Sequence, residues 1–501
     1  MVSILVISSI IVILFTCYKW LTTTKSRHPL PPGPKGLPIV GNLPFLDPQL
    51  HVCYAKLSQF YGPILKVRLG SKLCIVVSSS SVAKNVLRDH DAIFANHDVP
   101  AVGYAGTYGG VDIVWSPNGD HLRMLRKVCV KELMTGPRLE ALYGLRRREV
   151  RDMVSKIYSD VEHPIEIGEI VLVTMFQLIT SMLWGGTLEE QDRNRVSLEF
   201  QQVTAEMVKL LGELNVSDFF PAIAMFDLQG KVREMKKLRS WFDGIFDFVI
   251  KKKLEGMEND FEKKDFLQIL LESKEKEDHK TPFSLTHIKA ILLDMMVAGT
   301  KTSSTTIEWV MAELMKHPES MTRVQEELKD IVGVDNIVEE SHLQKLKYLN
   351  AVVKEVLRLH PTAPLLVPRV SSESCTVGGY MIPKGATVIV NAWAIHRDPE
   401  FWDNPLEFRP ERFLNFDSEY DFRGTNFSYI PFGSGRRICV GVPLAERMIP
   451  YLLASLLHSF NWKLPEETEI DLSEMFGLEL KKKNPLIAIP IPRLLEPGLY
   501  A

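Results

Sequence analysis

One cysteine of the chain, Cys439, stands in a setting suited to binding a metal. Glycines lie around it at Gly433, Gly435 and Gly441, and glycine lets a backbone turn tightly because it has no Cβ. A chain that turns around a cysteine can aim backbone N–H groups at the sulfur and keep it as the thiolate, the form that binds metals. The apolar, helical pattern of Pro443–Phe460 would place the positive end of a helix dipole beside the sulfur. These residue types predict a metal centre in which the Cys439 sulfur is the one soft, electron-rich ligand from the protein.

The segment around this cysteine resembles the haem-binding loop of the cytochrome P450 family. The positions that carry the resemblance are Phe432, Gly433, Gly435, Arg437, Cys439 and Gly441, with Ala445 in the following helix. The resemblance implies that Cys439 is the axial thiolate of a haem b iron, that Phe432, Gly433 and Gly441 form the loop around it, and that Arg437 meets a haem propionate. An axial thiolate pushes electron density onto the iron and favours O–O cleavage.

A second stretch of chemistry-bearing residues, Ala298–Ser303, lies in the long helical pattern Leu285–Met315. In the family, a glycine here, matched by Gly299, widens a helix groove over the haem for O2, and a threonine with an acidic neighbour passes protons to oxygen. Thr302 matches the threonine, but Lys301 stands where Asp or Glu is usual. We therefore expect slow or poorly coupled turnover, with the threonine hydroxyl and water still able to carry protons.

Two more arginines resemble haem-propionate contacts of the family, Arg126 and Arg369. Arg126 matches its position on a predicted helix, but Leu122 replaces the Trp that usually lies four residues before it. Leucine has no N–H to donate, so one propionate contact is expected to be lost. Two readings of His121 stay open, because it either replaces that donor or faces solvent.

Glu355 and Arg358 lie three residues apart, so they share one face of a predicted helix. Alone, such a pair is a surface ion pair of little worth. In the family the pair is buried, and a third partner comes from a downstream segment that matches Pro410–Phe413, which supplies Arg412. The resemblance implies that these three residues lock the helices behind the haem, and it gives them no acid–base role.

The segments that overhang the iron in the family are mostly small and apolar in this chain, and almost no charge is expected to point in. Part of the set could equally be plain core. Apolar pockets with few polar groups bind apolar ligands. The predicted substrate residues are Ala101, Val111, Ile113, Val297, Ala298, Leu365, Leu366 and Phe476.

Finer similarity is carried by the proline-rich segment Pro29–Pro38 and by the segments Tyr108–Trp115 and Met182–Gly186. They look most like plant microsomal members that oxidise terpenoids, cadinene-type sesquiterpene hydroxylases among them. The resemblance implies a monooxygenase that hydroxylates a small apolar plant metabolite, first a sesquiterpene-like terpenoid. Flavonoid or phenylpropanoid hydroxylation is the alternative, because relatives of that group also act on flavonoids.

The implied reaction uses O2 and electrons from outside the chain. The sequence has no G-x-G-x-x-G nucleotide site, so NADPH is expected only indirectly, through NADPH–cytochrome P450 reductase. Two other functions stay open: a haem-thiolate isomerase or dehydratase that needs no reductase, which Lys301 favours, and a haem or ligand binder that lost catalysis through Leu122 and Lys301. The net charge of −3 shows no basic excess for nucleic acid.

The helical and strand-like patterns that must position these residues predict a mainly α fold with a small β region. This fold forms one catalytic domain over residues 45–501. Strand-like runs come early, at Ile64–Leu69 and Leu73–Ser78, and helical patterns dominate Asp120–Phe460. The charged stretch Glu272–Thr281 predicts a surface loop, and late strands are expected after Lys483. With 46% hydrophobic and 24% charged residues, a disordered or multi-span membrane chain is excluded.

The chain starts with an apolar run, Val2–Tyr18, that contains no charged residue. A cleaved signal peptide needs a basic residue before the run and small residues after it, and a buried core segment is also possible, but an uncleaved anchor over residues 1–20 fits best. Lys19, Lys25 and Arg27 follow the run, which predicts a single-pass protein of the endoplasmic reticulum membrane with a cytosolic body. Residues 21–44 are the expected basic linker and stiff proline-rich hinge, Pro29–Pro38.

Overall fold

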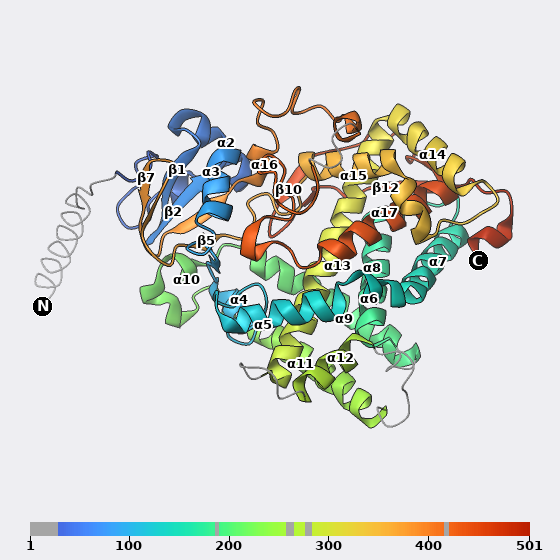
Figure 1. Cartoon of the computed structure of the whole chain (residues 1–501), viewed down its shortest axis with the longest axis horizontal. Helices are drawn as coiled ribbons and strands as arrows, with labels where there is room; N and C mark the ends of the chain where they lie inside the picture. The colour runs from blue at the N-terminus through green and yellow to red at the C-terminus, as the bar shows by residue number, and fades with distance from the viewer. Residues whose placement is uncertain (1–28, 186–189, 257–264, 276–282, 415–419) are drawn as a thin grey trace, which may run out of the picture.

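The computed structural model of the chain describes residues 29–185, 190–256, 265–275, 283–414 and 420–501. A large helical part adjoins a smaller β-rich part, which lies at the end where residue 29 enters (Figure 1). This arrangement confirms the mainly α fold with a small β region. The predicted anchor, residues 1–20, and the first part of the linker lie outside the described residues.

The helical part is built around one long helix that crosses the middle of the molecule, α13 (Figure 1). Its neighbours bury most of its surface, so its sequence is apolar on more than one side. The helices are α2 (Leu50–Tyr61), α3 (Ser80–Lys84), α4 (Ala101–Gly106), α5 (Asp120–Val128), α6 (Gly136–Ala141), α7 (Tyr143–Ser159), α8 (Ile167–Trp184), α9 (Glu190–Gly212), α10 (Val216–Phe219), α11 (Lys231–Gly256), α12 (Phe266–Glu275), α13 (Leu285–Lys316), α14 (Pro318–Val332), α15 (Lys347–Leu359), α16 (Ala392–Ile395) and α17 (Val442–Ser459).

The main sheet has the strand order β1-β2-β8-β5-β3. Strands β1 and β2 form an antiparallel hairpin, β8 pairs with β2 in parallel, and β5 and β3 continue antiparallel. The strands of this sheet are β1 (Ile64–Leu69), β2 (Lys72–Val77), β3 (Asn96–His97), β5 (Arg369–Val370) and β8 (Thr387–Val390).

Three small sheets complete the β structure. Strand β12 lies between β4 and β9, and two hairpins form from β6 with β7 and from β10 with β11. These strands are β4 (Ile165–Glu166), β6 (Cys375–Val377), β7 (Tyr380–Ile382), β9 (Phe460–Lys463), β10 (Glu474–Phe476), β11 (Leu480–Lys482) and β12 (Ile487–Pro492).

Most predicted elements are confirmed, with small shifts at their ends. The first predicted strand matches β1, and the second starts one residue early as β2. After Lys483 a late strand follows as β12, whereas β11 covers part of the lysine run itself. The predicted surface loop Glu272–Thr281 is wrong at its start, because α12 continues to Glu275. Leu267, Leu270 and Leu271 are buried and hold the helix against the body, so packing outweighs the charged composition.

Helix α8 is the one described helix that is long and apolar enough to span a membrane. It packs against α13 and α7, and most of its length is buried in the protein. A helix that is apolar all round and enclosed by other helices is a core helix of a large domain. α8 is therefore the support on which α13 rests.

The described part of the proline-rich hinge lies against the sheet instead of standing apart from it. Proline cannot donate a backbone hydrogen bond, but its carbonyl still accepts one. The N–H of Lys66 in β1 donates to Pro32 O at 2.8 Å, and the N–H of Met381 in β7 donates to Pro29 O at 3.1 Å. These bonds fix the direction in which the chain enters the body.

Candidate active site

The loop before α17 holds Cys439 through two glycines in left-handed conformation. Gly433 and Gly435 both have φ of +72°, a region that favours glycine. A Cβ at Gly435 would lie 2.4 Å from Leu87 O, so the loop passes too close to the backbone for any other residue. The N–H of Cys439 donates to Phe432 O at 3.1 Å and closes the turn.

The Cys439 sulfur meets the backbone donors that the sequence predicts. The N–H of Gly441 donates to Sγ at 3.4 Å, and α17 begins at the next residue, Val442. Burial raises the pKa of the thiol, whereas the N–H groups of Gly441 and Val442 and the charge of Arg126 lower it. The thiol is nevertheless exposed to small molecules. The loop therefore holds the cysteine through its backbone and leaves it accessible to a bound group.

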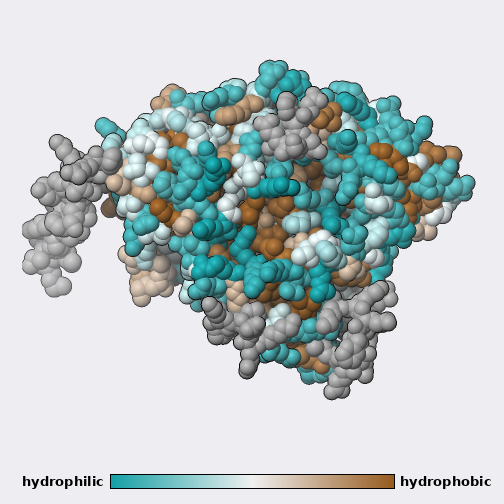
Figure 2. Space-filling model, in the orientation of Figure 1, coloured by the Kyte–Doolittle hydropathy of each residue, from teal (hydrophilic) through white to brown (hydrophobic). Residues whose placement is uncertain are grey.

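Helix α13 contributes an exposed stripe of small residues to the site. Ala298 and Thr302 lie one turn apart and are exposed, although the helix around them is largely buried. The Thr302 hydroxyl donates to Ala298 O at 2.7 Å. Figure 2 shows apolar residues gathered at the centre of one face, between β10 and α5. Gly299 has a different surrounding, because a Cβ there would lie 3.2 Å from Ile179 of α8, so it permits close packing of the two helices.

Arg437 and Arg369 are buried at the cysteine loop and donate to backbone carbonyls. Arg437 donates to Ala95 O at 2.6 Å and to Ile113 O at 3.0 Å. Arg369, in β5, donates to Ser434 O at 3.1 Å and so reaches the loop itself. The two predicted propionate contacts therefore lie at one end of the cysteine loop, although they come from distant parts of the sequence.

Arg126 joins this cluster from α5, where its Nη2 donates to Ile438 O at 2.9 Å. His97 lies among the three guanidinium groups; burial and their charges lower its pKa to about 3, so it is neutral. Burial and the other two arginines lower the pKa of Arg437 to about 10, and burial lowers that of Arg369 to about 10. The sequence alone did not identify His97, because nothing near it in the chain marks its partners.

These charges test whether haem fits the site. The Asp91 carboxylate forms an ion pair with Arg369, with 3.6 Å between Oδ1 and Nη1, and so balances one of the three positive charges. Arg126 and Arg437 still repel each other. Two carboxylates between them would remove that repulsion, and haem b carries two propionates. With the accessible Cys439 sulfur, the donor set fits haem b, and these residues would hold it.

Leu122 and His121 do not restore the lost propionate donor. Leu122 is buried in the core, and the Nε2 of His121 donates to Val111 O at 3.1 Å. The His121 ring also lies 4.6 Å from the ring of His287 in α13. His121 therefore ties the segment before α5 to its surroundings, and the proposal that it simply faces solvent is wrong.

Two carboxyl groups, Asp112 buried and Asp294 half-buried, lie where the sequence predicted an almost uncharged region, and this expectation is corrected. Asp112 accepts from the N–H of Trp115 at 3.0 Å, and Asp294 of α13 accepts from the N–H of Ile113 at 2.8 Å. Burial raises the pKa of Asp112 to about 7 and that of Asp294 well above its usual value, and the closeness of Asp112 raises Asp294 further. Single Asp residues in otherwise apolar segments were the available signal.

The predicted substrate residues fall into groups. Ile113 and Val297 belong to the large apolar cluster around α13, whereas Leu365 and Phe476 pack in the cluster under β1 and β2. Leu366 lies against Gly433 of the cysteine loop. Val111 offers its carbonyl to His121, and Ala101 begins α4, where its N–H donates to Asp218.

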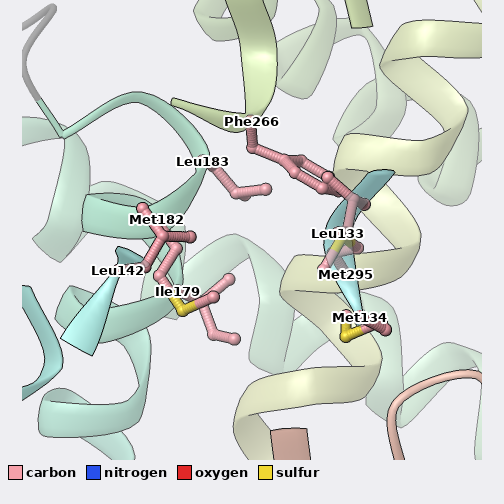
Figure 3. A pocket seen from close by; sticks show the side chains of 8 residues that line it. All are labelled: Leu133, Met134, Leu142, Ile179, Met182, Leu183, Phe266 and Met295. Atoms are coloured by element: carbon pink, nitrogen blue, oxygen red, sulfur yellow. The ribbon is translucent and has the colours of Figure 1, made fainter. Parts of the chain in front are cut away.

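A small cavity behind these groups contains none of the predicted substrate residues. Figure 3 shows its apolar side chains, which converge from α8, α12, α13, the turn after α5 and the end of α6. The cavity belongs to the packing of these helices, because no polar group lines it. Its lining residues are Leu133, Met134, Leu142, Ile179, Met182, Leu183, Phe266 and Met295.

The predicted ion cluster behind the site is present. Arg358 Nε and Nη2 donate to the two oxygens of Glu355 at 2.7 and 2.8 Å, and both residues are fully buried. Arg412, from the short turn η6 (Pro410–Phe413), reaches Glu355 at 3.3 Å. This cluster joins α15 to the segment that leads to the cysteine loop.

A second ionic cluster fixes the β10–β11 hairpin. The ring nitrogens of His360 lie 2.7 Å from Glu313 of α13 and 3.0 Å from Glu474 of β10. The indole of Trp309 stacks on the His360 ring at 4.0 Å between centroids. His360 thereby joins α13 to the hairpin that carries the predicted substrate residue Phe476.

This second cluster predicts acid sensitivity. Burial alone would raise the pKa of Glu474, but hydrogen bonds from His360 and His51 hold it at about 2. Because the folded-state pKa is below the unfolded one, the stabilisation is full above about pH 4.5 and is lost as the pH falls towards 2. Between neutral and acid pH, we expect the free energy of unfolding to fall by on the order of 2 kcal/mol less in E474Q than in the parent protein. Urea unfolding at several pH values measures this difference. Parallel curves for the variant and the parent protein would contradict it.

Comparison with known proteins gives consistent results. The family described as cytochrome P450 matches residues 31–489. A flavonoid 3'-monooxygenase from Crocosmia x crocosmiiflora is 40% identical, over 98% of this chain and 97% of its own length. A geraniol 8-hydroxylase from Catharanthus roseus is 39% identical, over 92% of this chain and 94% of its own. A solved zebrafish cytochrome P450 with progesterone has a TM-score of 0.76 and 27% identity, over 88% of this chain and 99% of that one.

The family match covers the helical body, the cysteine loop and the ion cluster behind it. Proteins of this family carry haem with an axial cysteine thiolate, use O2, and receive the electrons of NADPH indirectly through a redox partner. The similar plant proteins are hydroxylases and monooxygenases by name, so the isomerase and the non-catalytic binder are not supported. The chain therefore belongs to the cytochrome P450 family and is a haem-thiolate monooxygenase.

Proposed function

We propose that this monooxygenase hydroxylates a small apolar terpenoid of sesquiterpene-like character. Cys439 would bind the iron, Arg126, Arg369 and Arg437 would face the propionates, and Thr302 would carry protons. When bound, the haem supplies the activation of O2 and the transfer of one oxygen atom to the substrate. The observation that supports this assignment is the exposed Ala298–Thr302 stripe on an otherwise buried helix.

The side chains proposed to face the substrate favour a hydrocarbon. Most of them are aliphatic, and Phe476 is the one aromatic residue in the set. Their nearest carboxyl groups, Asp112 and Asp294, already accept hydrogen bonds from the backbone. A substrate with several hydroxyl groups would leave some of them without partners, which costs binding energy. The apolar skeleton of a terpenoid has no such cost.

A flavonoid substrate is the second candidate, because the flavonoid 3'-monooxygenase is as similar to this chain as the geraniol 8-hydroxylase. A planar, polyhydroxylated molecule would need polar partners in the site. Asp112 has one carboxylate oxygen without a hydrogen-bond partner among the described residues, and it is the group that would accept from such a hydroxyl.

We also propose that the body rests on the cytosolic side of the endoplasmic reticulum membrane, attached by residues 1–20. Exposed apolar side chains support a lipid-facing surface near the point where residue 29 enters. Ile39 and Phe45 follow the hinge, and Met225, Phe226 and Leu228 follow α10. The two segments meet at the β1–β2 turn, where Ser71 donates to Phe219 O at 2.9 Å. NADPH–cytochrome P450 reductase in the same membrane is the proposed electron donor.

The test is expression of the full chain in microsomes together with the reductase. A red-shifted absorbance band of the ferrous–CO form would report thiolate ligation. NADPH-dependent conversion of sesquiterpenes, with flavonoids unchanged, would support the first proposal, and the reverse result would select the flavonoid candidate. Conversion of neither class, with a normal ferrous–CO band, would contradict both substrate proposals.

A further inference from the structure

Glu479 is a buried carboxyl group that the chemistry described so far does not use. It lies in the turn between β10 and β11, and only 7% of its surface is exposed. Its Oε2 accepts from the Thr305 hydroxyl of α13 at 3.3 Å. Its Oε1 has no hydrogen-bond partner among the described residues. Buried carboxylate oxygens are rarely left without partners, so this one calls for an explanation.

Glu479 lies against α13, and the next residue, Leu480, holds it in this position. The N–H of Leu480 donates to Thr362 O at 2.9 Å, and its carbonyl accepts from the Trp309 indole at 3.1 Å. Trp309 lies one helical turn beyond Thr305, so the hairpin is held along the helix by two successive contacts. The carboxyl group therefore stays at Thr305 and does not swing into solvent.

On α13, Thr305 is the neighbour of the two residues that matter for proton delivery. It lies three positions after Thr302 and four after Lys301, and both spacings place side chains side by side on a helix. Lys301 is half-buried and acts electrostatically on Glu479. A carboxyl group thus contacts Thr305 and acts on Lys301, the residue directly before Thr302, although it comes from a segment distant in the sequence.

We propose that Glu479 supplies the carboxyl group of the proton path to Thr302, in the place of the acid that the sequence lacks at position 301. This inference rests on the proposed monooxygenase function. When Glu479 holds its proton, the Thr305–Glu479 hydrogen bond reverses, and the carboxyl O–H donates to the Thr305 oxygen. Thr305 then takes up the proton from Glu479 as it passes its own hydroxyl proton towards Thr302. The Lys301 ammonium stabilises the carboxylate that remains, and solvent returns the proton to Glu479. Glu479 is a positioning residue, because it acts through the threonines.

The charges around Glu479 agree with this role. Burial raises its pKa, and Glu308 of α13 raises it further, while Lys301, Lys481 of β11 and the Thr305 hydrogen bond lower it. An acid with a pKa above its usual value holds its proton closer to neutral pH and can donate it there. The expectation of poor coupling from Lys301 alone is thereby revised, since the missing carboxylate has a replacement.

The test begins with E479Q in the holoenzyme with reductase. Glutamine keeps the size of the side chain and an acceptor for Thr305, but it releases no proton. We expect peroxide formed per product to rise about tenfold or more, with an unchanged ferrous–CO band. The matched control is E308Q, which removes a carboxylate near Lys301 that bonds to the N–H of Leu486 at 2.8 Å and not to Thr305. Because Glu308 only raises the pKa of Glu479 and bonds to no threonine of the path, E308Q should uncouple turnover much less than E479Q.

The double variant K301D/E479Q moves the carboxylate to position 301 and should restore coupling, whereas a purely structural role of Glu479 predicts no rescue. Stability gives a readout apart from turnover. Because the folded-state pKa is raised, the parent should lose stability as the pH rises above about 4.5, and E479Q should lack this loss. Parent-like coupling in E479Q, or equal leakage in E308Q, would overturn the inference. A parent protein without product would instead refute the proposed function.

Discussion

Serine at position 439 is expected to abolish monooxygenase turnover, with a loss of at least about a thousandfold. The C439S hydroxyl is far less acidic than a thiol and does not offer the soft anionic ligand that favours O–O cleavage. The two backbone N–H groups and the charge of Arg126 that stabilise a thiolate would then face a neutral oxygen. The measurement is the ferrous–CO spectrum, in which the red-shifted band should disappear, together with product formation.

The matched control for this variant is C375S. Cys375 is half-buried in β6, where it pairs with Ile382 of β7. The control should keep both the spectrum and the turnover of the parent protein. A red-shifted band in C439S would exclude Cys439 as the ligand, and loss of the band in C375S would show that the spectrum reports general damage.

The second large effect concerns folding. R358A is expected to destabilise the body by about 3–5 kcal/mol, because it leaves the Glu355 carboxylate buried without its bidentate partner. Glu355 has no exposed surface, and Arg358 also donates to Pro405 O at 2.7 Å and His396 O at 3.0 Å. Lysine cannot restore this planar set of donors, so R358K should recover little. Urea unfolding measures both variants.

A surface pair with the same spacing provides the control. Asp120 and Arg123 form an ion pair three residues apart on α5, and both side chains are largely exposed. R123A should change the urea midpoint little, since exposed pairs contribute little to stability. Equal destabilisation by R123A and R358A would contradict the buried-charge explanation. If R358A had normal stability but no turnover, the Glu355 cluster would have a catalytic role instead of a structural one.

Local motifs allowed much of the fold and site to be predicted. The glycines around Cys439 dictate a tight turn wherever the chain goes next, and the Glu355–Arg358 spacing sets one helix face. The long helix through Thr302 follows from its apolar pattern, and its observed span, Leu285–Lys316, differs from the prediction by one residue. In each case the responsible residues are neighbours in the chain, so short-range geometry was sufficient.

What the sequence determined by itself was therefore the cysteine loop, the long helix through Thr302 and the family. The tertiary structure alone decided which groups surround them. It brought Glu479 of the β10–β11 turn to Thr305, and His97 among three arginines. It also paired Asp112 with Asp294. The physical reason is that these contacts join residues far apart in the chain, such as Thr305 and Glu479, which are 174 positions apart. They form only when the helices and sheets pack together, and neither the periodicity nor the spacing of a local segment predicts that packing.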